Sequence, residues 1–174
     1  MAITVETGSG NALSESFASV ADCDSYFSLR GVTIWTVLVT AEKEQALRRA
    51  TDFMQQAYRD RWSGFRASSA QALDWPRYDV PVKDLPGNFS NGTVYFPSNA
   101  VPAEVKTACI MLAIKAAAGE LAPDLGSQKS KVKIGPIETE YFAGTRQSTK
   151  FQAVEKLLQP FFTGSGLSMK VVRA

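Results

Sequence analysis

The sequence predicts a mainly α-helical protein, a compact bundle of about four helices with a long aromatic loop, a small β-hairpin and extended N- and C-terminal arms. The chain has 174 residues, 45% of them hydrophobic and 21% charged, which is enough to bury one core. Four segments carry apolar residues at helical spacing, and one short segment alternates polar and apolar residues. We expect a single domain over residues 1–163, including an extended arm at 1–18, followed by a tail at 164–174.

Two helices are expected in the first third of the chain. Residues 1–18 are rich in Gly, Ser, Thr and Asn and are predicted to be weakly structured unless a neighbouring element holds them. A helix follows from about Val20 to Arg30, with Ser19 as its N-cap and Asp22 three positions later, the spacing of a capping box. A second helix begins after Thr40 and has the clearest amphipathic pattern in the protein.

Helical periodicity is lost over residues 61–100, where seven aromatic residues are spaced among Gly, Pro, Asn and Ser. Structureless segments of this length are unusual, so we expect the aromatic side chains to pin the loop against the helices, with residues 88–92 as an exposed tip. Trp75 is interpreted as a core anchor. The alternative is a binding loop in which Arg77 stacks on or beside Trp75.

The last part of the chain is predicted to form two helices and a hairpin. A third helix begins at Pro102 and continues to about Leu121, and a fourth runs from about Thr149 to Gln159. Between them, residues 131–134 and 137–141 alternate polar and apolar on either side of a Gly-Pro turn. The first arm of this hairpin is basic and the second acidic, so cross-strand charge pairs are expected to help fix its register.

The residue inventory argues against an enzyme, and we expect neither a cofactor nor a bound metal. The chain has no histidine, which excludes Ser-His and Cys-His nucleophile pairs and His-ligated zinc. Cys23 and Cys109 share no CxxC spacing and are expected to be small buried hydrophobic residues. Three carboxylate pairs are interpreted as solvated surface groups, namely Asp22 with Asp24, Asp74 with Asp79 and Glu138 with Glu140.

No signal peptide is visible, and no apolar stretch approaches the roughly 20 residues that span a bilayer, so we expect a soluble protein without a membrane partner. Charge is unevenly distributed. Residues 1–126 carry 11 basic and 14 acidic residues, net −3, whereas residues 127–174 carry 8 basic and 3 acidic residues, net +5. The C-terminal part of the chain is therefore suited to a negative partner surface.

A second basic feature permits a nucleic-acid hypothesis. Five arginines are interleaved with Trp62 and Phe65, a composition that can bind single strands; they are Arg48, Arg49, Arg59, Arg61 and Arg66. Acidic residues lie among them, which favours a helix with intrahelical ion pairs instead. The tail after residue 164 also permits two interpretations, a frayed terminus or a segment that inserts into a partner through its alternating apolar residues.

Several segments together carry a family resemblance: Val5–Gly10, Ser16–Asp22, Lys43–Phe53, Leu73–Arg77, Val101–Lys106 and Val132–Glu138. In these segments the chain resembles a family of bacteriophage and prophage proteins often labelled DnaT-like single-stranded DNA-binding proteins. It is also similar to the head–tail connector, or adaptor, proteins of long-tailed phages. We rank the connector function first, with a phage single-stranded DNA-binding replication protein as the alternative.

The resemblance to connectors implies a structural subunit of the virion neck, assembled in the host cytoplasm. Twelve copies would form a ring that docks on the portal and joins it to the next neck or tail component, while genomic double-stranded DNA passes through without sequence-specific binding. Connectors commonly engage the portal with a C-terminal extension, and the positions here that could do so are Leu167, Met169, Lys170, Val171, Val172 and Arg173. Contacts with ring neighbours or the neck are expected from the hairpin, at Lys131, Lys133, Ile134, Ile137 and Tyr141.

Overall fold

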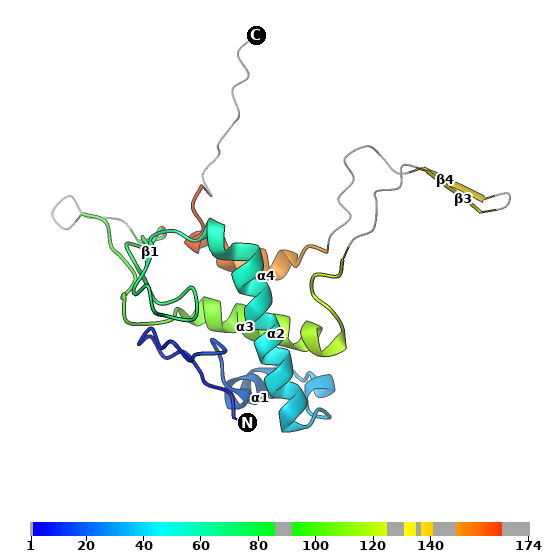
Figure 1. Cartoon of the computed structure of the whole chain (residues 1–174), viewed down its shortest axis with the longest axis horizontal. Coiled ribbons are helices and arrows are strands. Elements are labelled where there is room, and N and C mark those ends of the chain that lie inside the picture. The colour runs from blue at the N-terminus through cyan, green and yellow to red at the C-terminus, as the bar shows by residue number, and fades with distance from the viewer. Residues whose placement is uncertain (1, 86–91, 125–130, 135–136, 141–148, 165–174) are drawn as a thin grey trace, which may run out of the picture.

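The amphipathic segment that follows residue 39 folds as the longest helix, and the α-helices that precede and follow it in the chain pack against it (Figure 1). The computed structural model describes residues 2–85, 92–124, 131–134, 137–140 and 149–164. Within these residues the α-helices are α1 (Val20–Ser28), α2 (Thr40–Tyr58), α3 (Ala103–Ala118) and α4 (Gln152–Leu158). Short 3₁₀ turns are η1 (Thr33–Trp35), η2 (Arg59–Arg61) and η3 (Gln159–Phe161). The strands are β1 (Phe65–Arg66), β2 (Arg77–Tyr78), β3 (Lys131–Ile134) and β4 (Ile137–Glu140). The mainly α-helical class with four helices is confirmed.

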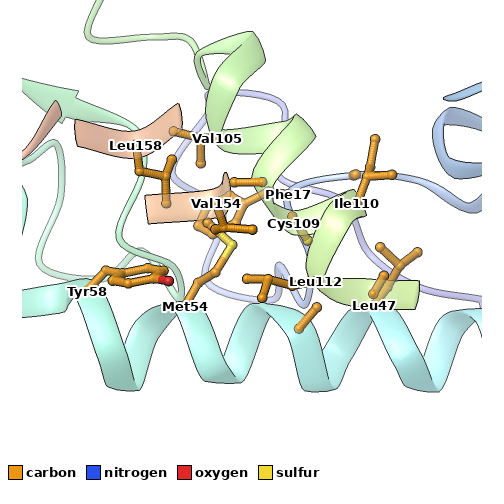
Figure 2. Packing of buried hydrophobic residues seen from close by; sticks show 14 of the residues in the cluster. Phe17, Leu47, Met54, Tyr58, Val105, Cys109, Ile110, Leu112, Val154 and Leu158 are labelled. Carbon is orange, nitrogen blue, oxygen red and sulfur yellow. The ribbon is translucent and has the colours of Figure 1, made fainter. Parts of the chain in front are cut away.

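The core is built where α3 packs against α2 on one side and α4 on another (Figure 1). Small residues at the crossing allow α2 and α3 to approach closely, because Ala46 and Ala50 of α2 and Ala113 of α3 are all fully buried. Larger side chains fill the space beside them (Figure 2). From α2 come Leu47, Met54 and Tyr58, from α3 Val105, Cys109 and Leu112, and from α4 Val154 and Leu158.

The predicted capping box begins α1. Ser19 Oγ accepts a hydrogen bond from the Asp22 amide at 3.1 Å, and an Asp22 carboxylate oxygen accepts one from the Ser19 amide at 2.9 Å. The helix ends at Ser28, two residues earlier than predicted, because Gly31 turns the chain with φ +65°. The Val32 amide then donates to the Phe27 carbonyl oxygen at 3.0 Å, which closes the helix end.

The N-terminal arm is held much more firmly than its composition indicates. The side chain of Glu6 is fully buried, and its carboxylate accepts hydrogen bonds from the amides of Gly8, Gly10 and Asn11 and from the hydroxyl of Ser14. Its backbone amide donates to the carbonyl oxygen of a residue ten positions later at 2.8 Å. The arm therefore folds around one buried carboxylate and becomes part of the domain.

The segment 61–100 is a loop with short stretches of pairing. β1 and β2 form an antiparallel pair, and residues 80–82 pair with 94–96 through backbone hydrogen bonds. Trp75 is fully buried, so its interpretation as a core anchor is confirmed; its ring meets Trp62 and Phe161 edge-on at 5.7 and 5.6 Å. The aromatic residues do not all point inward, however, because Phe65 is 71% exposed and Tyr95 is 52% exposed.

The later elements follow the sequence with shifted boundaries. Pro102 is the N-cap of α3 rather than its first residue, and α3 stops at residue 118, three positions before the predicted end. α4 begins at residue 152 instead of 149. In the hairpin, Lys131 faces Glu140 and Lys133 faces Glu138, so the expected register of basic against acidic positions is confirmed. Residues 88–91 of the expected loop tip, Tyr141 and the tail positions 167–173 lie outside the described residues.

Both cysteines are buried and free of disulfides, as expected. Burial raises the pKa of Cys23 and of Cys109 far above that of an ordinary thiol, which removes the reactive thiolate at neutral pH. We expect neither thiol of the folded protein to react with Ellman's reagent over minutes, whereas unfolding in guanidinium should release both. Rapid labelling of either cysteine in the native state would contradict this burial.

Candidate nucleic-acid interface

Of the five arginines predicted to line a binding surface, Arg48, Arg59 and Arg66 are held by partners within the molecule. Arg48 forms a salt bridge with Glu15 at 2.9 Å, and Arg59 forms one with Asp74 at 2.9 Å. Arg66 donates to a backbone carbonyl oxygen within its own loop. Trp62, which the hypothesis placed between the arginines, is 5% exposed and cannot stack on a ligand. Trp62 is therefore excluded as a stacking residue, whereas Arg49, Arg59 and Arg61 of the predicted cluster are exposed.

Two further predictions concern the loop around Trp75. Asp74 was expected at the solvated surface but is buried, because its carboxylate pairs with Arg59 beneath the loop. Arg77 is also buried and donates to the carbonyl oxygens of Ser63, Asp74 and Gly64 at 2.8, 3.2 and 2.7 Å. Burial lowers the pKa of the Arg77 guanidinium. The guanidinium holds parts of the loop 61–100 together through these hydrogen bonds and is not exposed to a ligand.

A hollow with excess positive charge lies where η2 meets α4 and η3. We call it the cationic groove; its volume is about 570 Å³ and its lining comprises Arg61, Lys150, Gln152, Glu155, Lys156, Gln159, Phe162, Thr163 and Gly164. Three cations and one carboxylate line it, a formal balance of +2. The walls are joined by the backbone, because the Thr163 amide donates to the Arg61 carbonyl oxygen at 2.7 Å.

The cations of the groove are held to different degrees. The Arg61 guanidinium lies 4.1 Å above the centre of the Phe162 ring, which fixes its position while leaving part of it exposed. Glu155 faces Lys150 at 3.2 Å and Arg61 at 3.9 Å. The exposed Lys156 has no ion-pair partner within the described part of the chain. One carboxylate thus faces two of the three cations, and the excess charge remains available to an anion.

A second, smaller hollow extends the groove. It has a volume of about 310 Å³, shares Lys156 and Gln159 with the cationic groove, and adds Lys83, Asp84 and Pro160. Lys83 is held by a hydrogen bond from Nζ to the Phe162 carbonyl oxygen at 2.7 Å. The two hollows together form a strip in which cations outnumber carboxylates four to two.

An exposed pair of aromatic residues lies on the adjoining strands. Phe65 and Tyr78 are direct partners across the β1–β2 ladder and are 71% and 50% exposed. Gly64 makes this pairing possible: its φ is +67°, and a Cβ there would lie 2.0 Å from the Tyr78 carbonyl oxygen. Phe65 follows Arg61 by four positions, so their Cα atoms are at most about 14 Å apart. The aromatic pair therefore begins within this distance of one wall of the cationic groove.

A separate apolar surface occurs between α1 and α2. Four aliphatic side chains from one stretch of 11 residues are each more than 60% exposed, and we call them the N-terminal apolar patch: Leu29, Ile34, Val37 and Val39. Single exposed apolar residues are ordinary, but a group of them is typical of a contact surface.

The residues predicted for contacts only partly coincide with those of the candidate site: Arg61 lines the cationic groove and Phe65 is exposed beside Tyr78. Of the hairpin positions predicted to touch neighbours, Lys131, Lys133, Ile134 and Ile137 lie on β3 and β4. The groove cations Lys150 and Lys156 were not singled out, although they lie in the C-terminal part whose net charge is +5. That charge excess was the only signal in the sequence that pointed toward them.

Within the described residues, no helix has the combined length and apolar character needed to cross a membrane. The same residues contain no group of three potential metal-ligating side chains.

A family model described as "Putative DnaT-like ssDNA binding protein" matches residues 1–174, the whole chain. No curated protein and no solved structure matches it.

Proposed function

We propose that this chain, which belongs to the family described as "Putative DnaT-like ssDNA binding protein", binds single-stranded DNA in the cationic groove. The protein would not alter the DNA chemically. The observation that carries this proposal is the groove itself, whose lining contains three cations, Arg61, Lys150 and Lys156, and a single carboxylate, Glu155. Proteins that bind single strands without sequence preference typically use a positively charged groove that follows the phosphate backbone.

The groove has the chemistry for phosphates rather than for a small neutral ligand. Its lining is mostly charged and polar side chains from η2, α4, η3 and the residues next to them. Arg61 is held over the Phe162 ring, so less side-chain freedom is lost when its guanidinium binds a phosphate. Lys156 joins the two hollows and is available to a strand that passes from one to the other.

The decisive measurement is fluorescence anisotropy with a short labelled oligothymidylate at several salt concentrations. We expect the affinity of the wild-type protein to fall steeply as the salt concentration rises. In the double variant Lys150→Ala/Lys156→Ala, the magnitude of the slope of log affinity against log salt should be smaller by about 1.4, roughly 0.7 for each lost phosphate contact. The matched control is Lys106→Ala/Lys115→Ala on α3, which removes the same charge elsewhere and should keep the wild-type slope. Equal slopes for the two double variants would overturn the proposal.

A second candidate function is the head–tail connector, and the N-terminal apolar patch favours it. A ring subunit must offer apolar surface to its neighbours, and Ile34 and Val37 supply such surface outside the groove. In this function the protein would form a ring of twelve copies on the portal in the virion neck, with the C-terminal tail and the hairpin as contact segments.

The two functions give different results with purified material. A connector should form rings, alone or on the portal, whose symmetry can be counted in electron micrographs. The double variant Ile34→Glu/Val37→Glu should abolish these rings without changing oligonucleotide affinity. A DNA-binding replication protein should bind oligothymidylate with the same affinity when those two positions carry Glu and should be absent from purified virions. Rings that survive both substitutions would remove the support that the patch gives to the connector.

A further inference from the structure

We infer that Phe65 and Tyr78 form a base-stacking platform that makes the proposed DNA site prefer single strands over duplexes, an inference that rests on the proposed function. The two rings occupy directly opposed positions of an antiparallel pair, where Cβ atoms lie about 4.5–5.5 Å apart. Both rings are largely exposed. Two adjacent exposed rings offer apolar area on which unpaired bases can stack.

The platform is fixed before any ligand arrives. Beneath it, Arg77 donates to the carbonyl oxygens of Ser63 and Gly64, which ties the start of β1 to the start of β2. The Ser63 amide donates to the Phe161 carbonyl oxygen at 2.8 Å and so anchors the β1 side to η3. Because the backbone is already ordered, stacking requires little further loss of conformational freedom.

The neighbouring charge identifies the occupant. The cationic groove begins at Arg61, four residues before Phe65, so one polyanion can place phosphates in the groove and bases over the rings. An apolar protein segment would satisfy the rings but would leave the excess cations of the groove unpaired. In a duplex the base faces are covered by neighbouring bases, and only unpaired bases can use the platform.

The test compares three full-length proteins in anisotropy titrations with labelled oligothymidylate and with a duplex of equal length. For Phe65→Ala/Tyr78→Ala we expect at least about tenfold weaker binding to the single strand and little change for the duplex. The salt slope should stay at the wild-type value because no cation is removed. The matched control is Ile34→Ala/Val37→Ala, which removes exposed apolar side chains from the N-terminal apolar patch and should bind like wild type.

A second readout reports stacking directly. Trp35, Trp62 and Trp75 are all buried, so Phe65→Trp adds the one tryptophan that is exposed among the described positions. Its fluorescence should be quenched by oligothymidylate and protected from acrylamide by the bound strand. Titration without quenching or protection would argue that the bases do not reach position 65.

The outcomes separate the two proposals. If the wild-type protein fails to bind oligothymidylate, both the DNA-binding function and the platform are overturned. If it binds, but Phe65→Ala/Tyr78→Ala keeps the same affinity and the same preference for single strands, only the platform is overturned. A double variant that changes the sedimentation of the protein and leaves DNA affinity unchanged would identify the pair as a protein contact and would also overturn the platform.

Discussion

Replacing Trp75 with alanine should lower the free energy of unfolding by about 3–5 kcal/mol, the usual loss when a large aromatic side chain is removed from a packed core. The indole is fully buried and lies edge-on to the rings of Trp62 and Phe161. Phe161 also stacks on Phe96, with ring centres 5.0 Å apart. Loss of the indole would therefore leave a cavity where the loop 61–100 meets η3.

Guanidinium unfolding followed by far-UV circular dichroism measures this loss. Trp75→Phe is the graded variant, and it should cost less because it keeps a ring and because the indole N–H has no hydrogen-bond partner among the described residues. Tyr95→Ala is the matched control, since its ring is 52% exposed, and it should change stability by no more than about 0.5 kcal/mol. Similar values for Trp75→Ala and Tyr95→Ala would contradict the packing.

Replacing Glu6 with alanine is the second change with a large expected effect, again about 3–5 kcal/mol, because partners of a buried charge would be left unsatisfied. The carboxylate accepts hydrogen bonds at 2.8, 3.0 and 2.9 Å from the amides of Gly8, Gly10 and Asn11, and at 3.0 Å from Ser14 Oγ. Alanine removes all four acceptor contacts from a fully buried position. Glu6→Gln should also destabilise the protein, since its amide group would face donors.

The effect of Glu6→Ala should be local as well as global. Hydrogen exchange should show faster exchange of the amides of Gly8, Gly10 and Asn11, which have lost their acceptor. Glu15→Ala is the control from the same arm: its carboxylate pairs with Arg48 but is 40% exposed, so we expect a much smaller loss of stability than for Glu6→Ala. Wild-type exchange of the Gly8, Gly10 and Asn11 amides in Glu6→Ala would show that the carboxylate does not hold the arm.

The features that sequence predicted well are those fixed by neighbours in the chain. The capping box of Ser19 and Asp22 needs only a spacing of three, and the register of Lys131 against Glu140 follows from a short turn. The amphipathic pattern located α2 because its buried stripe repeats over 19 residues. The size of Trp75 was enough to assign it to the core.

The features that the sequence did not predict depend on pairing between polar groups, which a hydropathy pattern does not reveal. Residues 1–18 are rich in Gly and Ser, and this composition does not show that the carboxylate of Glu6 is buried. Asp74 is buried with its carboxylate in a salt bridge with Arg59, a pairing that the sequence does not reveal. The cationic groove needs Arg61 and α4 to lie together although about 90 residues separate them. The uneven charge of the chain and the arginine cluster that includes Arg61 pointed toward this region, but neither places Arg61 beside α4.

The residues that follow η2 pair with those that follow η3, and this pairing affects how the chain folds during its synthesis. Trp62 forms a β-bridge with Phe162, and the Thr163 hydroxyl donates to the Trp62 carbonyl oxygen across 101 residues. The ribosome synthesises Phe161 and Phe162 long after Trp62 and Trp75, so the nascent chain holds two indoles without their final neighbours until then. A newly made chain arrested before residue 160 should consequently attract chaperones that bind exposed aromatic segments.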